Sequence, residues 1–266
     1  MTFLFGFFVF VFGLVFGSFL NVCIYRFPRG ESVIRPGSHC PACQKSIGWR
    51  DNLPLASFIS LGGKCRHCGA KIAPRYFMVE LISGLLWVGI WLTHGLTPYA
   101  LAGIVLVSIL LAVTVTDFET GLIPDALSLP GIGIGLLLGG LFPELQGTNV
   151  WYLGLVRAAL GLVMGGGIIY LTGMIGSFVF RRESMGGGDV KLLAMIGAFL
   201  GVKKTALVFL FAPFAAMPFA LYTLFLKAQK KEDLRYQSIP YGPFLAVTAA
   251  IFYFFGDKIS SVFFAF

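Results

Sequence analysis

Hydrophobic residues occur along this chain in long runs that short polar segments separate. Uninterrupted apolar runs occupy residues 2–25, 76–93, 99–116, 126–142, 150–180, 190–201, 205–226 and 241–255. Most of these runs approach the roughly 17–25 residues that a helix needs to cross a bilayer. The run at 190–201 is short, which favours a half-spanning or tilted helix. The pattern predicts about eight transmembrane helices.

Composition agrees with this pattern. Of 266 residues, 57% are hydrophobic and only 12% are charged. Soluble domains carry about 25% charged residues. The mean hydropathy is +0.86. We therefore expect an all-α polytopic membrane protein.

The distribution of basic residues predicts how the chain is oriented. The net charge is +8, but it does not indicate a nucleic-acid partner, because the Lys and Arg residues cluster between apolar runs. Nine lie at 26–75, three at 181–191 and four at 227–235. Such clusters mark cytoplasmic loops. With eight helices, these three segments share the cytoplasmic side and both termini lie outside.

The same pattern predicts three parts: a first transmembrane helix at 1–25, a cytoplasmic loop domain at 26–75 and a helical membrane domain at 76–266. The first run lacks a basic start and an A-x-A-like cleavage site, so we expect it to be retained as a helix. Pairs of glycines four residues apart permit close contact between membrane helices. They are Gly13 with Gly17, Gly135 with Gly139, and Gly161 with Gly165.

Four of the five cysteines lie in the 26–75 loop, as two C-x2-C pairs that twenty-one residues separate: Cys40, Cys43, Cys65 and Cys68. Paired knuckles of this kind are typical of a tetrahedral structural zinc site, in which four thiolates leave no open position for catalysis. Two disulfides or free thiols are the alternatives, and a cytoplasmic location argues against disulfides. The spacing does not distinguish zinc from iron.

Two aspartates adjoin apolar runs, where an ionisable group costs at least about 2.5–3.5 kcal/mol at membrane depth. Asp117 closes the run at 99–116, before Gly121 as a plausible helix cap, and Asp189 follows Gly186–Gly188. Both are expected at the cytoplasmic face. Two nearby carboxyls can divide acid and base work between them. The pair is therefore a candidate active site, and the glycines can bring backbone close to a substrate or to Asp117.

Two other acidic residues, Asp125 and Glu80, are expected to have structural rather than catalytic roles. Asp125 lies between Pro124 and Ala126, and we expect it to cap the N-terminus of the next helix. Glu80 lies early in an apolar run and is expected to pair with a neighbouring base. The three glycines before Asp189 do not form a dinucleotide-binding motif, because no strand precedes them.

Several motifs in one order resemble those of the type IV prepilin peptidase family. The resemblance begins at 17–26 (GSFLNVCIYR), continues through the two cysteine knuckles and includes 75–81 (RYFMVEL). Asp117 with LIPD at 122–125 is similar to the first catalytic segment of that family. The stretch MGGGDVKLL at 185–193 resembles the second, which carries the G-x-G-D motif of membrane aspartyl proteases.

The resemblance implies an enzyme of the bacterial inner membrane. It would cleave the basic leader of type IV prepilins or of pilin-like type II secretion proteins, and then N-methylate the new N-terminus with S-adenosylmethionine. Asp117 and Asp189 would be catalytic, and the supporting residues would be Gly186, Gly188, Asp125 and Lys191. No methyltransferase motif is visible, so methylation and its donor rest on the resemblance alone, with no residues assigned to the donor.

Two other functions stay open at this level. One is a peptidase without methyltransferase activity. The other is a cation- or proton-coupled transporter in which the aspartates are ion sites, although pseudo-symmetric halves are not apparent. Prepilin-type substrates and the lipid bilayer are the expected partners, and the sequence does not indicate an oligomeric state.

Overall fold

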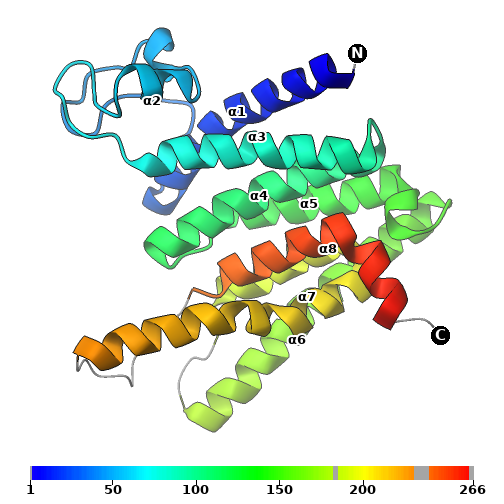
Figure 1. Ribbon diagram of the computed structural model, residues 1–266. Helices are drawn as coiled ribbons and strands as arrows, with labels where there is room; N and C mark the ends of the chain where they lie inside the picture. Colours follow the sequence, from blue (N-terminus) through cyan, green and yellow to red (C-terminus); the bar gives the residue numbers. More distant parts are fainter. Residues whose placement is uncertain (1, 182–184, 231–239, 264–266) are drawn as a thin grey trace. The chain divides into compact units, whose positions relative to one another are not determined.

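The computed structural model describes residues 2–181, 185–230 and 240–263. The described residues form long helices joined by short loops, with two isolated β-bridges and no strand among them. The long helices are α1 (Thr2–Arg26), α3 (Pro74–His94), α4 (Pro98–Thr120), α5 (Asp125–Leu141), α6 (Trp151–Phe180), α7 (Gly187–Lys230) and α8 (Gly242–Phe263) (Figure 1). The all-α prediction is confirmed. The predicted basic segments at 181–191 and 227–235 extend beyond the described residues.

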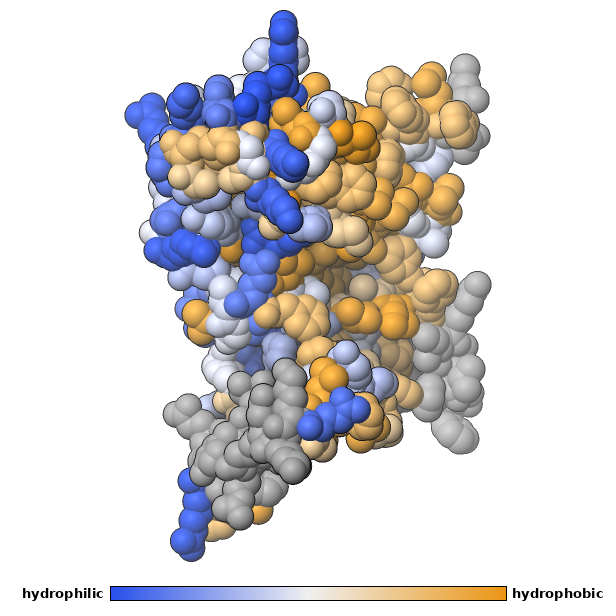
Figure 2. Space-filling view, turned by 60° about the vertical axis from the view of Figure 1, so that its left-hand side comes forward, coloured by the Kyte–Doolittle hydropathy of each residue, from blue (hydrophilic) through white to orange (hydrophobic). Residues whose placement is uncertain are grey.

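Five of these helices, α1, α3, α4, α6 and α7, are long and apolar enough to cross a membrane. Over the described residues, α5 and α8 are shorter apolar helices. Many large hydrophobic side chains, such as those of Phe12, Leu92 and Phe178, are exposed on the helices. Wide hydrophobic areas are correspondingly visible on the surface (Figure 2). This is the surface of a multi-pass membrane protein; the number of eight crossings stays a prediction.

The chain forms two compact units, Met1–Ala112 and Val113–Phe266. The first unit contains α1, the cysteine loop, α3 and most of α4. The second contains the end of α4 and the helices α5 to α8. The predicted boundaries at residues 25 and 75 separate the cysteine loop from the helices, whereas the compact units divide at residue 112. The three predicted parts stay a prediction.

In the first unit α1 and α3 lie side by side, with the cysteine loop joining them at one end (Figure 1). Glycine allows this approach. A methyl group on Gly13 would lie 2.8 Å from Cα of Gly84, and one on Gly17 would lie 2.8 Å from Cα of Glu80. The close contact predicted for this glycine pair is confirmed.

In the second unit the tightest helix contact joins α6 to the beginning of α7. A methyl group on Gly161 would lie 2.2 Å from the carbonyl oxygen of Gly197, and a methyl group on Gly197 would lie 2.1 Å from the carbonyl oxygen of Gly161. On α5, a methyl group on Gly135 would lie 2.9 Å from Cβ of Ala198. Because small residues interlock in this way, α5 and α6 hold the beginning of α7 firmly.

The helix α7 turns back on itself at Gly201, whose φ of 70° and ψ of 178° are not helical. A methyl group on Gly165 would lie 2.4 Å from the carbonyl oxygen of Leu193 and 3.1 Å from Cγ2 of Thr205. Those two atoms are therefore within about 5.5 Å of each other, whereas twelve residues of straight helix span about 18 Å. The apolar runs predicted at 190–201 and 205–226 lie in the two arms of this hairpin.

Candidate active site and metal centre

Asp117 lies in the last turn of α4, as its sequence context predicts. The helix ends at Thr120, and the N–H of Gly121 donates to the carbonyl oxygen of Asp117 at 2.9 Å. Gly121 has a φ of 66°, which is typical of the residue that ends a helix. The side chain of Asp117 points inward, and the residue is only 5% exposed. An acid at this position is withdrawn from bulk water.

Asp189 lies in the first turn of α7, directly after the three glycines. Its N–H donates to the carbonyl oxygen of Gly186 at 3.1 Å. A methyl group on Gly186 would lie 3.4 Å from Oδ2 of Asp189. The glycine segment therefore folds close to the carboxyl group of Asp189.

The start of α8 contacts Asp117 and lies near Asp189. The N–H of Gly242 donates to Oδ2 of Asp117 at 3.1 Å, within the interior of the second unit. Tyr241, the residue before Gly242, is close enough to Asp189 for the charge of that carboxylate to act on its phenol. The charge of Asp117 also acts on Asp189. The ends of three helices thus converge on one pair of carboxyl groups.

Ile123 packs between two glycines of this site. A methyl group on Gly188 would lie 2.9 Å from Cβ of Ile123, and one on Gly242 would lie 2.9 Å from its Cδ1. The glycines before Asp189 were expected to bring backbone close to a substrate or to Asp117. The contact observed is with Ile123, which lies in the loop that follows Asp117.

The prediction that Asp125 caps α5 is wrong. Pro124 occupies the capping position in extended conformation, and Asp125 is the first helical residue. Its two carboxylate oxygens instead accept hydrogen bonds from Nζ of Lys191 at 2.6 and 2.7 Å. A lysine ammonium provides charge-assisted hydrogen bonds, which are stronger than bonds to neutral N–H groups. The pair joins the start of α5 to the start of α7.

Tyr241 and Gly242 are site residues that the sequence interpretation missed, because it treated them only as the beginning of the last apolar run. Pro240 and Pro243 flank them. A glycine between two prolines at a helix start is a local signal for a constrained backbone. It does not reveal what that backbone contacts.

The four cysteine sulfurs of the loop lie within 4.8 Å of one another. The Sγ atoms of Cys40 and Cys68 are 3.9 Å apart. Tetrahedral coordination with Zn–S bonds of about 2.3 Å requires sulfur atoms about 3.8 Å apart. The residues Cys40, Cys43, Cys65 and Cys68 therefore fit a four-thiolate metal site.

The two knuckles share one backbone design. The N–H of Cys40 donates to the carbonyl oxygen of Lys45 at 3.0 Å, and that of Cys65 donates to the carbonyl oxygen of Ala70 at 2.8 Å. In each knuckle the residue after the second cysteine has positive φ, 58° at Gln44 and 70° at Gly69. The turns bring each pair of thiols to the same side.

Backbone N–H groups favour the thiolate form of one cysteine in the second knuckle. Hydrogen bonds from the N–H groups of Cys68 and His67 lower the pKa of the Cys65 thiol to about 7. The side chain of Arg66 forms a bidentate ion pair with Asp51, with Nη2 and Nε at 2.7 and 2.8 Å from the two carboxylate oxygens. This pair connects the knuckle to the segment between the two knuckles.

Two buried side chains attach the loop to the helices of its own unit. Arg26, 5% exposed, donates to the carbonyl oxygens of Ser32 and Pro36 at 2.7 Å each. Oε2 of Glu80 accepts the N–H of Leu55 at 2.9 Å. Glu80 was expected to pair with a base, so its backbone partner corrects that expectation.

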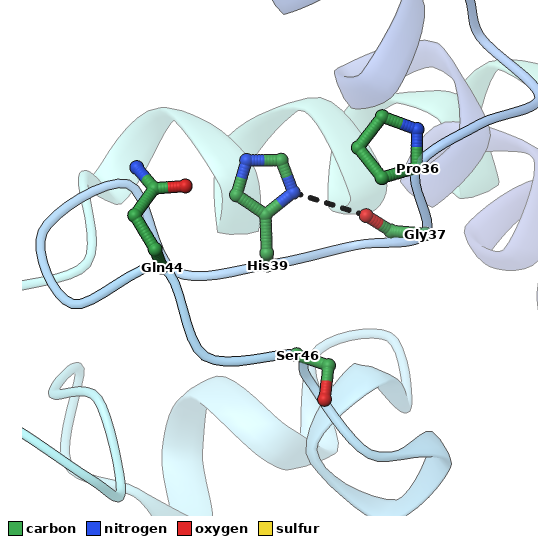
Figure 3. A pocket seen from close by; sticks show the side chains of 5 residues that line it. All are labelled: Pro36, Gly37, His39, Gln44 and Ser46. Carbon is green, nitrogen blue, oxygen red and sulfur yellow. Dashed lines mark hydrogen bonds between the residues drawn. The ribbon is translucent and has the colours of Figure 1, made fainter.

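A shallow hollow of about 320 Å³ lies beside the first knuckle. His39 is one of the residues that line it, and Figure 3 shows its ring beside Gly37, with Nδ1 3.0 Å from the carbonyl oxygen of that residue. The other residues that line it are Pro36, Gln44 and Ser46. The hollow is open to solvent and is formed by the turns that support the metal site.

Comparison with known proteins assigns two parts of the chain to known domain families. Residues 11–94 match the model of the bacterial peptidase A24 N-terminal domain, and residues 104–221 match that of the type IV leader peptidase family. A protein of Burkholderia pseudomallei (strain 1026b) is 34% identical over 94% of this chain and 85% of its own length. The chain belongs to the type IV leader peptidase family.

Other members of this family are similarly close. A Klebsiella pneumoniae protein is 41% identical over 61% of this chain and 71% of its own length. A Bacillus subtilis (strain 168) protein is 31% identical over 95% of both chains. A Myxococcus xanthus protein is 39% identical over 66% of this chain, and the match spans 56% of that relative. All four bear the name prepilin leader peptidase/N-methyltransferase. No solved structure matches the chain.

The two family models divide the candidate sites between them. The N-terminal model includes all four cysteines, and the leader peptidase model includes Asp117 and Asp189 but ends before Tyr241. The contact that α8 makes with Asp117 therefore lies outside the matched part of the family model.

Proposed function

We propose that this leader peptidase and N-methyltransferase cleaves prepilin-type substrates with Asp117 and Asp189 as its catalytic pair. The observation that carries the proposal is that the end of α4, with the buried carboxyl group of Asp117, and the start of α7, with Asp189, converge on the N-terminus of α8. Family membership also argues against a transporter. Lys191, Asp125, Gly186 and Gly188 would support the pair without taking part in the chemistry.

In this mechanism one carboxylate removes a proton from a water molecule while the other, protonated, carboxyl donates to the scissile carbonyl oxygen. The water oxygen bonds to the carbonyl carbon and forms a tetrahedral diol. When the C–N bond breaks, the first aspartate returns its proton to the leaving amine, and the second recovers a proton from the diol. The atoms and charges balance, and no covalent intermediate with the protein forms.

We place this chemistry at the cytoplasmic face of a bacterial inner membrane. The support is the cluster of nine basic residues at 26–75, together with two further basic segments that fall on the same side if the chain crosses eight times. The reversal of α7 at Gly201 separates two arms, which accords with eight crossings. The exposed apolar side chains would contact the lipid bilayer. Substrates would be prepilins of a type IV pilus or pilin-like proteins of a type II secretion system.

The four cysteines would hold a structural zinc ion, which supplies folding energy to a loop that lacks a large core. Methylation of the new N-terminus requires a methyl donor, and S-adenosylmethionine, when bound, supplies an electrophilic methyl group. Its binding residues are not assigned. The support for this donor is the N-methyltransferase name that the relatives bear.

One reconstitution tests the whole proposal. The detergent-purified protein is incubated with a prepilin and labelled S-adenosylmethionine, and leader cleavage and label transfer are measured separately. We expect Asp117→Asn and Asp189→Asn each to abolish cleavage, and Cys40→Ser to lower metal content. Full cleavage by either aspartate variant would refute the two-aspartate mechanism. Cleavage without label transfer would leave a peptidase alone.

A further inference from the structure

The residue at the start of α8 has no room for a side chain. A methyl group on Gly242 would lie 2.7 Å from Oδ2 of Asp117 and 2.9 Å from Cδ1 of Ile123. Carbon atoms essentially never approach this closely without displacing a neighbour. The first of these neighbours is an oxygen of a proposed catalytic carboxyl group. The requirement for glycine here therefore concerns the position of Asp117.

The backbone N–H of the same residue holds that oxygen in place. The N–H of Gly242 donates to Oδ2 at 3.1 Å, in a bond that is buried and joins residues 125 positions apart in the sequence. An N–H group in the first turn of a helix has no partner within the helix, so it is available to a carboxylate. This bond restricts the rotation of the Asp117 side chain, which otherwise has several rotamers.

The start of α8 also lies near the other aspartate. Ile123 packs against both Gly242 and Gly188, the residue that precedes Asp189. One short segment at the start of α8 is therefore bonded to Asp117 and lies close to the segment that carries Asp189, although the two aspartates are on different helices.

We propose that Gly242 is a positioning residue for the peptidase reaction, because its N–H and its missing side chain set where the carboxyl group of Asp117 lies relative to Asp189. This inference rests on the proposed two-aspartate function. Misplacing a catalytic group by about 1 Å can cost about 100-fold in rate. A displaced carboxyl group slows the chemical step, so we expect the loss to fall on kcat and to leave KM nearly unchanged.

Gly242→Ala tests the proposal in the full-length protein. We expect kcat for leader cleavage to fall about 100-fold, with KM changed by less than about threefold. We expect methylation of an already cleaved pilin to stay within about twofold of the wild type, because methyl transfer breaks no peptide bond and needs no acid–base pair for hydrolysis. Gly167→Ala is the matched control: the added methyl group meets no atom within 4 Å, and cleavage is unchanged. Wild-type kcat in Gly242→Ala, or equal loss of both activities, would overturn the proposal.

A double variant separates the two contacts of the added methyl group. Ile123→Val removes Cδ1, which relieves the contact with Ile123 but leaves the one with Asp117. We expect the double variant of Ile123→Val and Gly242→Ala to remain as slow as Gly242→Ala. Recovery of cleavage would assign the loss to packing and reject the positioning role. The Asp117→Asn and Asp189→Asn variants distinguish failure of the two-aspartate function from failure of the positioning role. If either aspartate variant still cleaves, the proposed function fails. If both are inactive and Gly242→Ala cleaves normally, only the positioning role of Gly242 fails.

Discussion

Nζ of Lys191 donates to both carboxylate oxygens of Asp125, at 2.6 and 2.7 Å, across 66 positions of sequence. Lys191 is two residues after Asp189, and Asp125 is eight residues after Asp117. The ion pair therefore connects the two segments that carry the proposed catalytic acids. Both side chains are partly exposed, 40% for Lys191 and 54% for Asp125, so water and salt screen the attraction. A contribution of about 0–1 kcal/mol to stability is expected for such a pair.

Exchanging the charges of this pair tests whether it aligns the two segments. Asp125→Lys and Lys191→Asp should each reduce kcat/KM for cleavage about 3- to 10-fold, because each places like charges opposite each other. The double exchange restores the attraction, and we expect it to recover at least half of the wild-type rate, as measured on a prepilin. A double variant that is as slow as the product of the two single losses would show that the residues act independently.

The metal site predicts a pH dependence of a definite sign. Metal binding requires thiolates, and protons compete for them, so affinity falls as pH falls. The pKa of the Cys65 thiol is lowered to about 7, so this thiol ionises at a lower pH than that of an ordinary cysteine. Zinc affinity, measured by competition with a chelating dye, should fall at least about 100-fold between pH 7.5 and 5.5. Cys65→Ser should bind more weakly at both values, while the helical circular dichroism signal is retained. Affinity that does not change with pH would exclude thiolate ligands.

Gln44 is a residue other than glycine with positive φ, where its counterpart in the second knuckle is Gly69. A side chain costs roughly 1–2 kcal/mol in this left-handed region, and glycine avoids that cost. Gln44→Gly should therefore stabilise the metal-loaded loop by about 0.5–1 kcal/mol, seen as slower metal release to a chelator. Gly69→Gln is the reciprocal variant, and we expect faster release. If both variants release metal faster, the Gln44 side chain contributes more than its backbone strain costs.

The contact between α6 and α7 predicts one of the most damaging small substitutions in the second unit. A methyl group on Gly197 would lie 2.1 Å from the carbonyl oxygen of Gly161, and backbone cannot yield as a flexible side chain can. Gly197→Ala should lower the free energy of unfolding by about 3 kcal/mol, at the upper end of overpacking effects. Gly167→Ala on α6, whose methyl group meets open space, should change it by less than about 0.5 kcal/mol. Thermal unfolding in detergent measures both variants. Equal stability would mean that the helices separate at little cost.

Local sequence was enough to predict features whose cause is local. The spacing of the cysteines predicts the cluster, and Gly121 predicts the end of α4 after Asp117. The glycine pair at 13 and 17 predicts the close contact of α1 with α3. In each case the residues that predict the feature are themselves part of it.

Features that depend on distant partners were missed. The bond from Gly242 to Asp117 joins residues 125 positions apart, and no pattern of apolar residues encodes it. Asp125 was expected to serve its own helix because only neighbouring residues were considered, while its partner Lys191 is reached through tertiary structure. The apolar runs at 190–201 and 205–226 predicted two separate helices and so a turn between them, but they did not predict that Gly201 makes the turn.

Gln146 binds the backbone just before that reversal. Its Nε2 donates to the carbonyl oxygens of Ala198 and Phe199 at 3.2 Å each. Arg157 fixes the segment that carries Gln146, because its Nη1 donates to the carbonyl oxygens of Gln146 and Gly147 at 2.9 and 2.7 Å. The loop at the end of α5 therefore stabilises the turn of α7.

Removing this amide should destabilise the turn while sparing the chemistry. Gln146→Leu removes both hydrogen bonds to the turn, at an expected cost of about 1–3 kcal/mol in the free energy of unfolding. Gln146→Glu is the matched variant, because it keeps the size of the side chain and loses the donor. We expect both to unfold at lower temperature in detergent and to cleave prepilin normally at low temperature, since the turn lies at the opposite end of the first arm from Asp189. Wild-type stability of Gln146→Glu would show that packing, rather than hydrogen bonding, holds the turn.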